Sequence, residues 1–223
     1  MTSDVFVIVA AYNEADRIAA TLVSLAEAFP GASLWVADDG SSDGTGAVAE
    51  AAGATVVRSE RVIGKGGAVT LAAQEALASK GSVALLCDGD LGESAAQLGP
   101  LVDAVQKDEV DLAVAAFSKR VGGGFGLAIG FAHWAIRRRC GLELRAPISG
   151  QRAMTAKTLA QVLPFAHGFG MEIGMTIDAV RAGARVGEID LDLSHRASGK
   201  TVAGFLHRGR QLIDFVRVYI SRR

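Results

Sequence analysis

Short apolar runs alternate with longer helical segments in the first half of the chain, and this alternation constrains the fold more than any other feature. The runs Val5 to Ala10, Leu34 to Ala37 and Val83 to Cys87 have the length and composition of buried strands. Residues 15–29 and 66–79 have helical periodicity or a helix-forming composition. Strands that alternate with helices form a mostly parallel sheet, because right-handed crossover helices pack on its faces. The sequence therefore predicts an α/β fold.

The remaining elements continue this order less regularly. We expect helices at residues 44–52, 95–106, 127–138 and 172–181, and extended segments at residues 55–57, 112–116, 148–154 and 185–194. Asn13 is expected to cap the first helix, because an asparagine oxygen can accept a hydrogen bond from the first helical turn. Gly122 to Gly126 interrupts the pattern.

Composition fits one globular domain and excludes several classes of protein. A chain of 223 residues with 50% hydrophobic residues can bury a sizeable core, and its formal net charge of -1 gives no indication of a nucleic-acid partner. No apolar run reaches the roughly 18 residues that span a bilayer, and the first strand begins without a signal-like leader. Cys87 and Cys140 do not form a disulfide framework, so we expect a cytoplasmic protein.

Asp88 and Asp90 flank a glycine directly after a predicted buried strand. In open α/β sheets the ligand crevice lies at the carboxyl ends of the strands, so both aspartates are expected there. Two carboxylates at this spacing can share Mg²⁺ or Mn²⁺ with substrate phosphates, since these ions prefer oxygen ligands. The alternative is an Asp-Gly turn with a solvated second aspartate. Other polar loops at the same edge favour the metal site.

Three loops place polar groups at this edge of the sheet. Residues 10–14 (AAYNE) follow the first strand, and residues 38–45 (DDGSSDGT) follow the second. Their carboxylates can accept hydrogen bonds from a nucleobase or ribose, and Tyr12 can line a base pocket, although ordinary turn chemistry also explains the second loop. Residues 64–67 (GKGG) open a helix whose N–H groups and Lys65 suit a diphosphate.

These loops do not match the common nucleotide-binding fingerprints. The lysine of the GKGG loop is not followed by serine or threonine, so the Walker pattern is absent. The first strand-to-helix turn also lacks the Gly-x-Gly-x-x-Gly of a dinucleotide fold. A different kind of nucleotide site is therefore expected.

Four motifs occur in the order AAYNEADRI, DDGSSDGT, GKGGA and CDGDL, and together they resemble the nucleotide-binding half of family-2-type glycosyltransferases with the GT-A fold. PISGQRAM is similar to a segment of polyprenyl-phosphate sugar synthases, and PFAHGFGMEIGMTIDAV followed by LSHR is similar to glucosyl-3-phosphoglycerate synthases. The resemblance implies a Rossmann-like, mostly parallel sheet flanked by helices. It also implies Mg²⁺ or Mn²⁺, a UDP- or GDP-sugar donor, and transfer of a sugar, expected to be a hexose, to a phosphorylated small molecule or a polyprenyl phosphate.

The resemblance further implies a division of the chain and a set of site residues. We expect one domain over residues 1–223, with a nucleotide-binding half at 1–117 and an acceptor-binding half with a C-terminal helix at 118–223. The residues expected to bind the donor nucleotide are Ala10, Tyr12, Glu14, Asp39, Lys65, Asp88, Gly89 and Lys200. Asp88, Asp90 and His195 are expected to hold the metal, and Asp90, Glu172 and Arg196 to act in catalysis.

The roles in the second half leave alternatives open. Glu172 follows a glycine-containing loop and could orient an acceptor hydroxyl, act as a base or hold sugar hydroxyls. It could equally be an acid favoured by the helix macrodipole. His195 could ligate the metal while Arg196 and Lys200 meet phosphate in a loop that closes over the donor. The alternative is a solvated histidine in an ordinary basic loop.

Several features depart from the resembled families or fit more than one function. Residues 91–94 (LGES) follow the acidic pair where many polyprenyl-phosphate synthases have a glutamine-containing segment. Residues 127–139 are expected to form an ordinary packed helix, although an acceptor wall or a peripheral membrane contact is an alternative. The segment 202–223 could cap the core, form a homodimer or lie on an anionic lipid surface.

Two other functions compete with a glycosyltransferase. A nucleotidyltransferase also uses metal-binding acids, but it would place a glycine-rich basic loop after the first strand, where this chain has AAYNE. A noncatalytic nucleotide-sugar-binding protein would bind donor without transferring or hydrolysing it.

Overall fold

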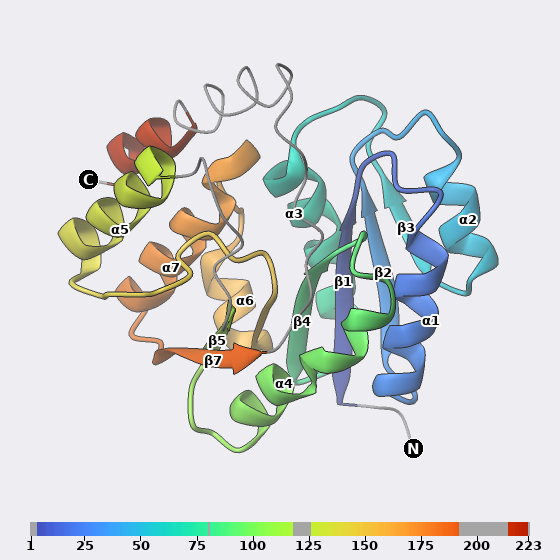
Figure 1. The fold of residues 1–223 in the computed structure, drawn as a ribbon, viewed down its shortest axis with the longest axis horizontal. Helices are drawn as coiled ribbons and strands as arrows, with labels where there is room; N and C mark the ends of the chain where they lie inside the picture. Colours follow the sequence, from blue (N-terminus) through green and yellow to red (C-terminus); the bar gives the residue numbers. More distant parts are fainter. Residues whose placement is uncertain (1–3, 80, 118–125, 192–213, 223) are drawn as a thin grey trace.

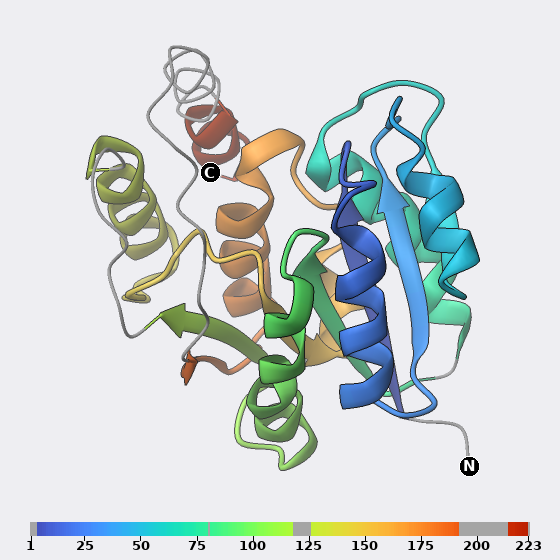
Figure 2. The ribbon, with the colours of Figure 1, turned by 45° about the vertical axis from the view of Figure 1, so that its right-hand side comes forward.

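The computed structural model describes residues 4–79, 81–117, 126–191 and 214–222. Its strands form a single sheet with helices on both sides (Figures 1 and 2). The strands are β1 (Val5–Ala11), β2 (Ser33–Asp38), β3 (Thr55–Arg58), β4 (Val83–Asp88), β5 (Leu112–Phe117), β6 (Arg152–Thr155) and β7 (Val186–Leu191). The α-helices are α1 (Ile18–Ala28), α2 (Thr45–Ala51), α3 (Lys65–Ala76), α4 (Gly99–Gln106), α5 (Gly126–Cys140), α6 (Ala156–Val162) and α7 (Met171–Arg181). Short 3₁₀ helices are η1 (Leu77–Ser79), η2 (Gly92–Leu98) and η3 (Gly168–Gly170), and residues 214–221 form a C-terminal helix.

The sheet is mostly parallel and contains a topological switch point. Its strand order is β3-β2-β1-β4-β6-β5-β7, and only β6 runs antiparallel to its neighbours β4 and β5. The chain winds outward from β1 to β3 and then returns to the other side of β1 as β4. Ala10 pairs with Asp88, and Ala11 pairs with Asp38. The carboxyl ends of β1, β2 and β4 therefore meet at one edge, which is where such sheets bind ligands.

Two apolar cores lie on opposite faces of the sheet. Val5, Val7 and Val9 of β1 point into one core, which α1, α2 and α4 cover. Phe6 and Ile8 point into the other, which α3, α6 and α7 cover. Because side chains alternate between the faces of a strand, a strand buried on both faces must be apolar throughout. This explains why the β1 and β4 sequences are continuous apolar runs rather than alternating ones, and it confirms the α/β prediction.

Three details differ from the sequence-based expectations. Asn13 does not cap α1, which begins later at Ile18 without a side-chain cap. Asn13 instead adopts a left-handed backbone, with φ of 55°, and its Oδ1 accepts a hydrogen bond from the Ser42 amide at 2.9 Å. The segment expected as one helix at 95–106 is divided into η2 and α4, with a proline in the first turn of α4. Proline lacks the N–H that a continuous helix would need at this point.

The second half of the chain adds a third apolar cluster around α5, α7 and the C-terminal helix. Phe215 and Val218 of the C-terminal helix pack with Ile136 of α5 and Ile177 of α7. The helix at 127–138 is therefore a packed helix, as expected, and the C-terminal segment caps the core over its described residues. The predicted boundary near residue 117 coincides with the end of β5, and residues 118–125 lie outside the described part. The division into two functional halves stays a prediction.

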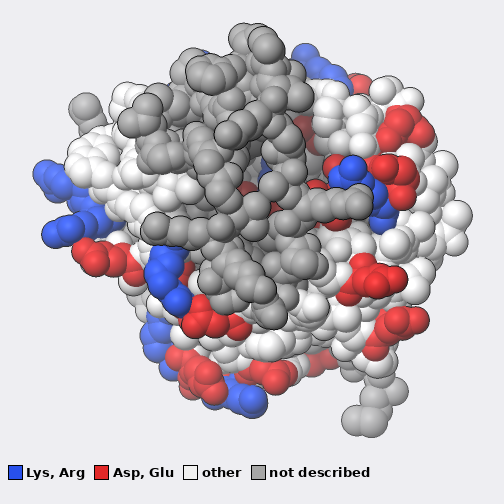
Figure 3. All heavy atoms as spheres, viewed as in Figure 1, with Lys and Arg blue, Asp and Glu red and all other residues white. Residues whose placement is uncertain are grey.

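The described surface has no dominant charge on the face in Figure 3. Lys and Arg side chains lie next to Asp and Glu side chains around the rim of this face. Arg185 illustrates the pattern, because its guanidinium contacts both Asp108 and Asp111. Within the described ranges, no helix is long and apolar enough to cross a membrane.

Candidate active site

A cavity of about 1050 Å³ opens at the carboxyl ends of β1, β2 and β4. It is bounded further by the start of α3, the loop before β6, the start of α7 and the C-terminal helix. This size is at the upper end of the roughly 300–1,000 Å³ common for small-ligand sites. The structure brings together these residues from the sequence-based prediction: Ala10, Tyr12, Glu14, Asp39, Lys65, Asp88, Gly89, Asp90 and Glu172.

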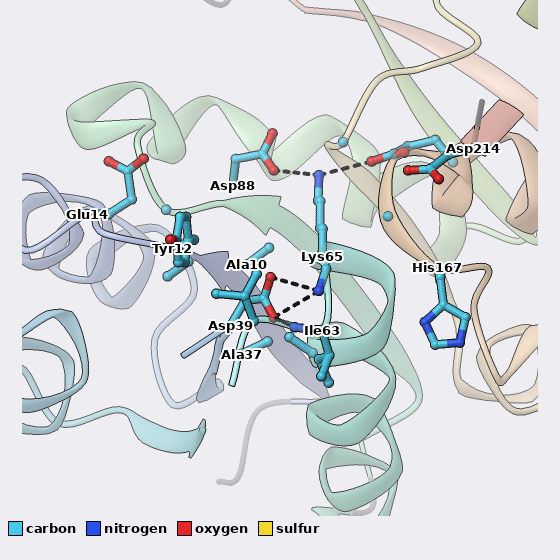
Figure 4. Close-up of a pocket in the computed structure, with 18 of the residues that line it drawn as sticks. Ala10, Tyr12, Glu14, Ala37, Asp39, Ile63, Lys65, Asp88, His167 and Asp214 are labelled. Carbon is cyan, nitrogen blue, oxygen red and sulfur yellow. Dashed lines mark hydrogen bonds and ion pairs between the residues drawn. The ribbon is translucent and has the colours of Figure 1, made fainter. Parts of the chain in front are cut away.

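The two aspartates at the end of β2, Asp38 within the strand and Asp39 just after it, have different environments. Asp38 is fully buried, and its Oδ1 accepts a hydrogen bond from the Ser41 amide at 2.9 Å. Asp39 lines the cavity and accepts hydrogen bonds from the amides of Ile63 at 2.7 Å and Gly64 at 3.0 Å (Figure 4). Burial raises the pKa of Asp39 above its ordinary value, although these two amides oppose the shift. Asp38 therefore shapes its own loop, while Asp39 fixes the loop before α3 and faces the ligand space.

The first two polar loops are hydrogen-bonded to each other. The amide of Glu14 donates to Thr45 Oγ1 at 2.8 Å, and the amide of Asn13 donates to Ser41 Oγ at 2.9 Å. Burial raises the pKa of Glu14, and the negative charge of Asp90 raises it further. Tyr12 is half-exposed at the mouth of the cavity, with 50% relative exposure. The DDGSSDGT loop thus has the turn role that its composition suggested, and it also supports the loop that carries Tyr12 and Glu14.

Lys65 joins the acidic pair to the second half of the chain. Its Nζ lies 2.6 Å from Asp88 Oδ1 and 3.0 Å from Glu172 Oε1. Burial disfavours the charged lysine, but the two carboxylates outweigh it and hold the pKa of Lys65 above its ordinary value. Lys65 is therefore a permanent cation between them. In Figure 4 it lies between Tyr12 and Glu14 on one side and His167 and Asp214 on the other.

Gln151 is a functional candidate that the sequence-based prediction missed. Its Nε2 donates to Asp88 Oδ2 at 2.8 Å, so both oxygens of Asp88 have a donor. The preceding Gly150 lines the cavity, and a Cβ built there would lie 2.7 Å from both Asp88 Oδ2 and Lys65 Nζ. A glutamine thus reaches the acidic pair from the SGQRA segment, although the LGES segment that follows the pair contains none. The quoted similarity of SGQRA was the signal that could have identified it.

Arg152 supports this segment from inside the protein. It is fully buried, and its guanidinium donates to Ser149 O at 2.8 Å, Thr176 Oγ1 at 2.9 Å and Pro147 O at 3.1 Å. Burial lowers the pKa of Arg152 to about 10, although the charge of Glu172 favours the protonated form. The guanidinium therefore connects the loop before β6 to α7, which carries Glu172.

The charge of the cavity suits a ligand that arrives with a cation. Its described lining includes six carboxylates, which belong to Glu14, Asp39, Asp88, Asp90, Glu172 and Asp214. The cationic side chains in the same lining are Lys65 and Arg217, with His167 as a further titratable group. A diphosphate alone would be repelled by this excess of negative charge.

The acidic pair fits Mg²⁺ or Mn²⁺ as part of an incomplete ligand set. Asp90 is exposed at the cavity, and the Asp88 carboxylate lines the same cavity, with hydrogen bonds from Lys65 and Gln151. The described residues contain no group of three His, Cys, Asp or Glu side chains that could hold a metal by itself. Mg²⁺ is commonly held by one or two carboxylates together with substrate phosphates, so two aspartates are a sufficient protein contribution.

Some predicted site residues lie outside the described part of the chain, and some residues that line the cavity were not predicted. His195, Arg196 and Lys200 lie outside the described residues, so their proposed contacts with metal and phosphate stay predictions. The cavity also has a side that the sequence did not predict, formed by His167, Asp214 and Arg217. His167 belongs to the HGFG stretch that the sequence analysis quoted. Asp214 and Arg217 belong to the C-terminal segment, where nothing in the sequence distinguished residues that line a cavity from residues that face solvent.

Comparison with known proteins identifies the family. Residues 6–160 match the model of glycosyl transferase family 2. The chain belongs to this family. It is 30% identical over 218 residues to the undecaprenyl-phosphate mannosyltransferase of Micrococcus luteus, a match that covers 88% of this chain and 86% of that protein. It is 32% identical over 201 residues to the glucosyl-3-phosphoglycerate synthase of Mycolicibacterium paratuberculosis, a match that covers 77% of this chain but only 58% of that protein.

Solved structures of similar glycosyltransferases agree with the fold. The glucosyl-3-phosphoglycerate synthase of Mycobacterium tuberculosis, in complex with Mn²⁺, UDP and glucosyl-3-phosphoglycerate, matches with a TM-score of 0.75 and 26% identity. That match covers 99% of this chain and 80% of the other. The GT-A fold and the glycosyltransferase activity predicted from the sequence are confirmed, and the family assignment contradicts the nucleotidyltransferase alternative.

Proposed function

We propose that this glycosyltransferase moves a hexose from a UDP-sugar to an acceptor that carries a phosphate, with Mg²⁺ or Mn²⁺ on the donor diphosphate. The observation that supports it most is the position of Asp88 and Asp90 at the switch point of the sheet, inside a cavity with an excess of carboxylates. The solved relative binds UDP and Mn²⁺, which favours UDP over GDP. The acceptors named for the two relatives are undecaprenyl phosphate and a phosphoglycerate. The feature that these acceptors share is a phosphate.

The nucleoside is assigned to the side of the cavity formed by β1 and β2. Tyr12 offers an aromatic surface for the base, and Asp39 has acceptor capacity beyond its two backbone donors. Ala10 has a small side chain and Gly89 has none, so the nucleotide can approach the ends of β1 and β4 closely. Glu14 is assigned to the ribose hydroxyls, because it lines the cavity. Its pKa is raised, but a carboxyl group can accept hydrogen bonds whether or not it is protonated.

The diphosphate is assigned to the centre of the cavity. The metal, when bound, neutralises charge that develops on the leaving diphosphate. Asp90 and Asp88 would hold it, and Gln151 and Lys65 keep the Asp88 carboxylate in place through both of its oxygens. Lys65 also brings a positive charge to the leaving group. His195, Arg196 and Lys200 are proposed to complete this group from outside the described residues.

Glu172 is assigned to the transferred sugar or the acceptor hydroxyl. Its side chain is 9% exposed at the start of α7 and is held by Lys65 at 3.0 Å. Its carboxyl oxygens can accept hydrogen bonds from sugar hydroxyls or orient the attacking group. The macrodipole alternative explains its position at a helix start but not its contact with Lys65.

We place the protein in the cytoplasm. If its acceptor is a polyprenyl phosphate, the protein must also contact the inner face of the membrane. The support for membrane contact is the acceptor named for the Micrococcus luteus relative, together with the exposed Trp134 beside the basic last turn of α5. A homodimer through the C-terminal segment is a further proposal that the described residues do not address.

Donor binding and turnover test this function. A thermal-shift panel of UDP-, GDP- and dTDP-sugars with and without Mn²⁺ should show stabilisation by a UDP-sugar that depends on the metal, because a ligand selective for the folded state raises its stability. Asp90→Ala should lose at least about a hundredfold in turnover while keeping its fold. Asp103→Ala, an exposed acid on α4, is the matched control. Full activity in EDTA or in Asp90→Ala would refute the metal assignment.

A further inference from the structure

The C-terminal helix rests on a row of glycines at the start of α7. A Cβ at Gly168 would collide with the Asp214 carboxylate, and a Cβ at Gly170 would collide with the Val218 side chain. A Cβ at Gly174 would lie 3.0 Å from Arg222 Cζ. A side chain at Gly170 would push the helix away from α7, because its Cβ would also lie 3.2 Å from the backbone oxygen of Asp214. At Gly168 and Gly174 it would displace the ends of the Asp214 and Arg222 side chains. The sequence therefore builds a close contact between the C-terminal helix and the helix that carries Glu172.

Polar contacts fix the same helix at its other end. Arg222 Nη2 lies 2.6 Å from Asp178 Oδ2, and Arg222 Nε lies 2.7 Å from the same oxygen. Arg139 of α5 donates to Tyr219 O at 2.7 Å, and its guanidinium lies 3.8 Å from the centre of the Tyr219 ring. Together with Phe215 and Val218 in the third core, these contacts give the helix a defined position. Side chains on its first turn are thus held at the cavity.

Asp214, Phe215 and Arg217 of this first turn line the cavity. Asp214 lies on the side opposite Tyr12 and Glu14, across Lys65 (Figure 4). The nucleoside is assigned to the Tyr12 side and the diphosphate to Asp88 and Asp90. The remaining space, between Glu172 and the C-terminal helix, is therefore available to the acceptor.

The two cationic side chains of the described lining differ in their availability to an anion. Lys65 is 27% exposed and lies within 3.0 Å of two carboxylates. Arg217 is 77% exposed, and its ion pair with Asp214 is longer, at 3.7 Å. An exposed pair of this kind contributes little and exchanges readily for a better partner. The Arg217 guanidinium can offer two parallel N–H donors to a phosphate, which is the geometry that favours arginine at such sites.

We infer that Arg217 binds the phosphate of the acceptor and that the C-terminal helix forms the acceptor side of the active site. This inference rests on the proposed transfer to a phosphate-bearing acceptor. The C-terminal helix lies outside the family match, which ends at residue 160.

The test compares acceptors with and without phosphate in steady-state kinetics. With UDP-sugar and Mn²⁺ saturating, 3-phosphoglycerate and a short-chain polyprenyl phosphate are the acceptor probes. Glycerate is the phosphate-free counterpart of 3-phosphoglycerate, whereas polyprenyl phosphate has no such counterpart because its phosphate carries the attacking oxygen. Arg217→Ala should raise the KM for the phosphate acceptor by about 10- to 100-fold, the effect expected for loss of a charge-assisted hydrogen bond. The Kd for UDP with Mn²⁺ and the kinetics with the phosphate-free counterpart should not change. Arg217→Lys should recover part of the loss, because it keeps the charge without the paired donors.

Two further variants separate a contact with phosphate from a general effect on structure. Arg137→Ala is the matched control, since Arg137 is 73% exposed, has one carboxylate at 3.3 Å and lies outside the cavity lining. It should leave the KM for 3-phosphoglycerate, which needs no membrane contact, unchanged. Asp178→Ala removes the partner of Arg222 and should raise the KM for the phosphate acceptor while Arg217 is still present, because the helix loses its fixed position.

The outcomes distinguish this inference from the proposed function. An unchanged acceptor KM in Arg217→Ala, with a wild-type enzyme that transfers to a phosphate acceptor, overturns the inference and leaves the proposed function intact. An equal loss with phosphate-free acceptors overturns it as well, since the guanidinium would then act on something other than phosphate. A wild-type protein that binds UDP with Mn²⁺ but transfers to neither phosphate acceptor overturns the acceptor class in the proposed function, and the inference with it.

Discussion

Replacement of Arg152 by methionine should destabilise the protein and weaken its active site together. Arg152 is fully buried and donates to two backbone carbonyls, of Ser149 and Pro147, and to the Thr176 hydroxyl. Methionine fills much of the same volume but donates no hydrogen bond. The two carbonyls would then be buried without these donors, whereas Thr176 keeps its bond to Glu172 O at 2.9 Å.

The expected loss of stability follows from these contacts. Each buried carbonyl that loses its donor costs about 1–3 kcal/mol. Part of this loss is offset, because a buried guanidinium is itself expensive to desolvate, as the lowering of the Arg152 pKa to about 10 indicates. A net decrease of about 2–4 kcal/mol in the free energy of unfolding is therefore expected. For a chain of this length that corresponds to a fall in Tm of roughly 4–16 °C.

Chemical denaturation and differential scanning calorimetry measure this change, and Lys157→Met on the exposed face of α6 is the control. The same variant should bind UDP with Mn²⁺ less tightly, because Gly150 and Gln151 immediately precede Arg152. A variant within about 0.5 kcal/mol of the wild type, the range of ordinary surface substitutions, would show that the guanidinium does not hold the loop before β6.

Three other substitutions probe the cavity and the surface. Gly150→Ala should lower turnover at least about tenfold and leave Tm nearly unchanged, because the added Cβ would displace only the movable ends of the Asp88 and Lys65 side chains. Gly99→Ala is the control in the same kinetic and thermal assays, because no atom lies within 4 Å of its added Cβ. Asp39→Ala should weaken UDP and UDP-sugar binding by a similar factor of about 10–100 in calorimetry, since both carry the same nucleoside, and a loss confined to the sugar donor would show that Asp39 is misassigned. Arg185 holds the pKa of Asp111 below its ordinary value, so Asp111→Asn should be less stable than the wild type at neutral pH. In denaturation experiments this difference in the free energy of unfolding should shrink as the pH falls below about 3.9, and a difference independent of pH would contradict the prediction.

The sequence predicted which residues of the first half meet at the cavity, because these residues lie at the ends of parallel strands. Continuous apolar runs identified β1, β2 and β4, and the residues that follow such strands must meet at one edge. The positions of Tyr12, Asp39 and Asp88 around the cavity follow from this rule alone. The rule does not distinguish Asp38 from Asp39, since both lie at the end of the same strand. Both are buried, but alternation at the end of β2 points Asp38 into the protein and Asp39 to the cavity.

The C-terminal side of the cavity could not be predicted in the same way. A helix that packs on α7 is recognisable as an apolar stripe, but the sequence does not say which of its polar residues face a cavity. Arg217 and Arg222 are separated by little more than one helical turn, yet one lines the cavity and the other pairs with Asp178. Their roles depend on the close approach to Gly168, Gly170 and Gly174, which only the tertiary structure reveals.

The contact between Gln151 and Asp88 shows how one reversed strand changes the site. Leu86 of β4 pairs with Arg152 of β6 in an antiparallel register, and continuing this register places Gly150 opposite Asp88. A parallel strand at this place would end beside the acidic pair, whereas the antiparallel strand begins there, so the residues just before it meet Asp88. The absence of a side chain at Gly150 leaves room for the Lys65 ammonium, and the next residue supplies the amide that holds the second oxygen of Asp88. The reversal of β6 therefore accounts for how a glutamine distant in sequence reaches the acidic pair.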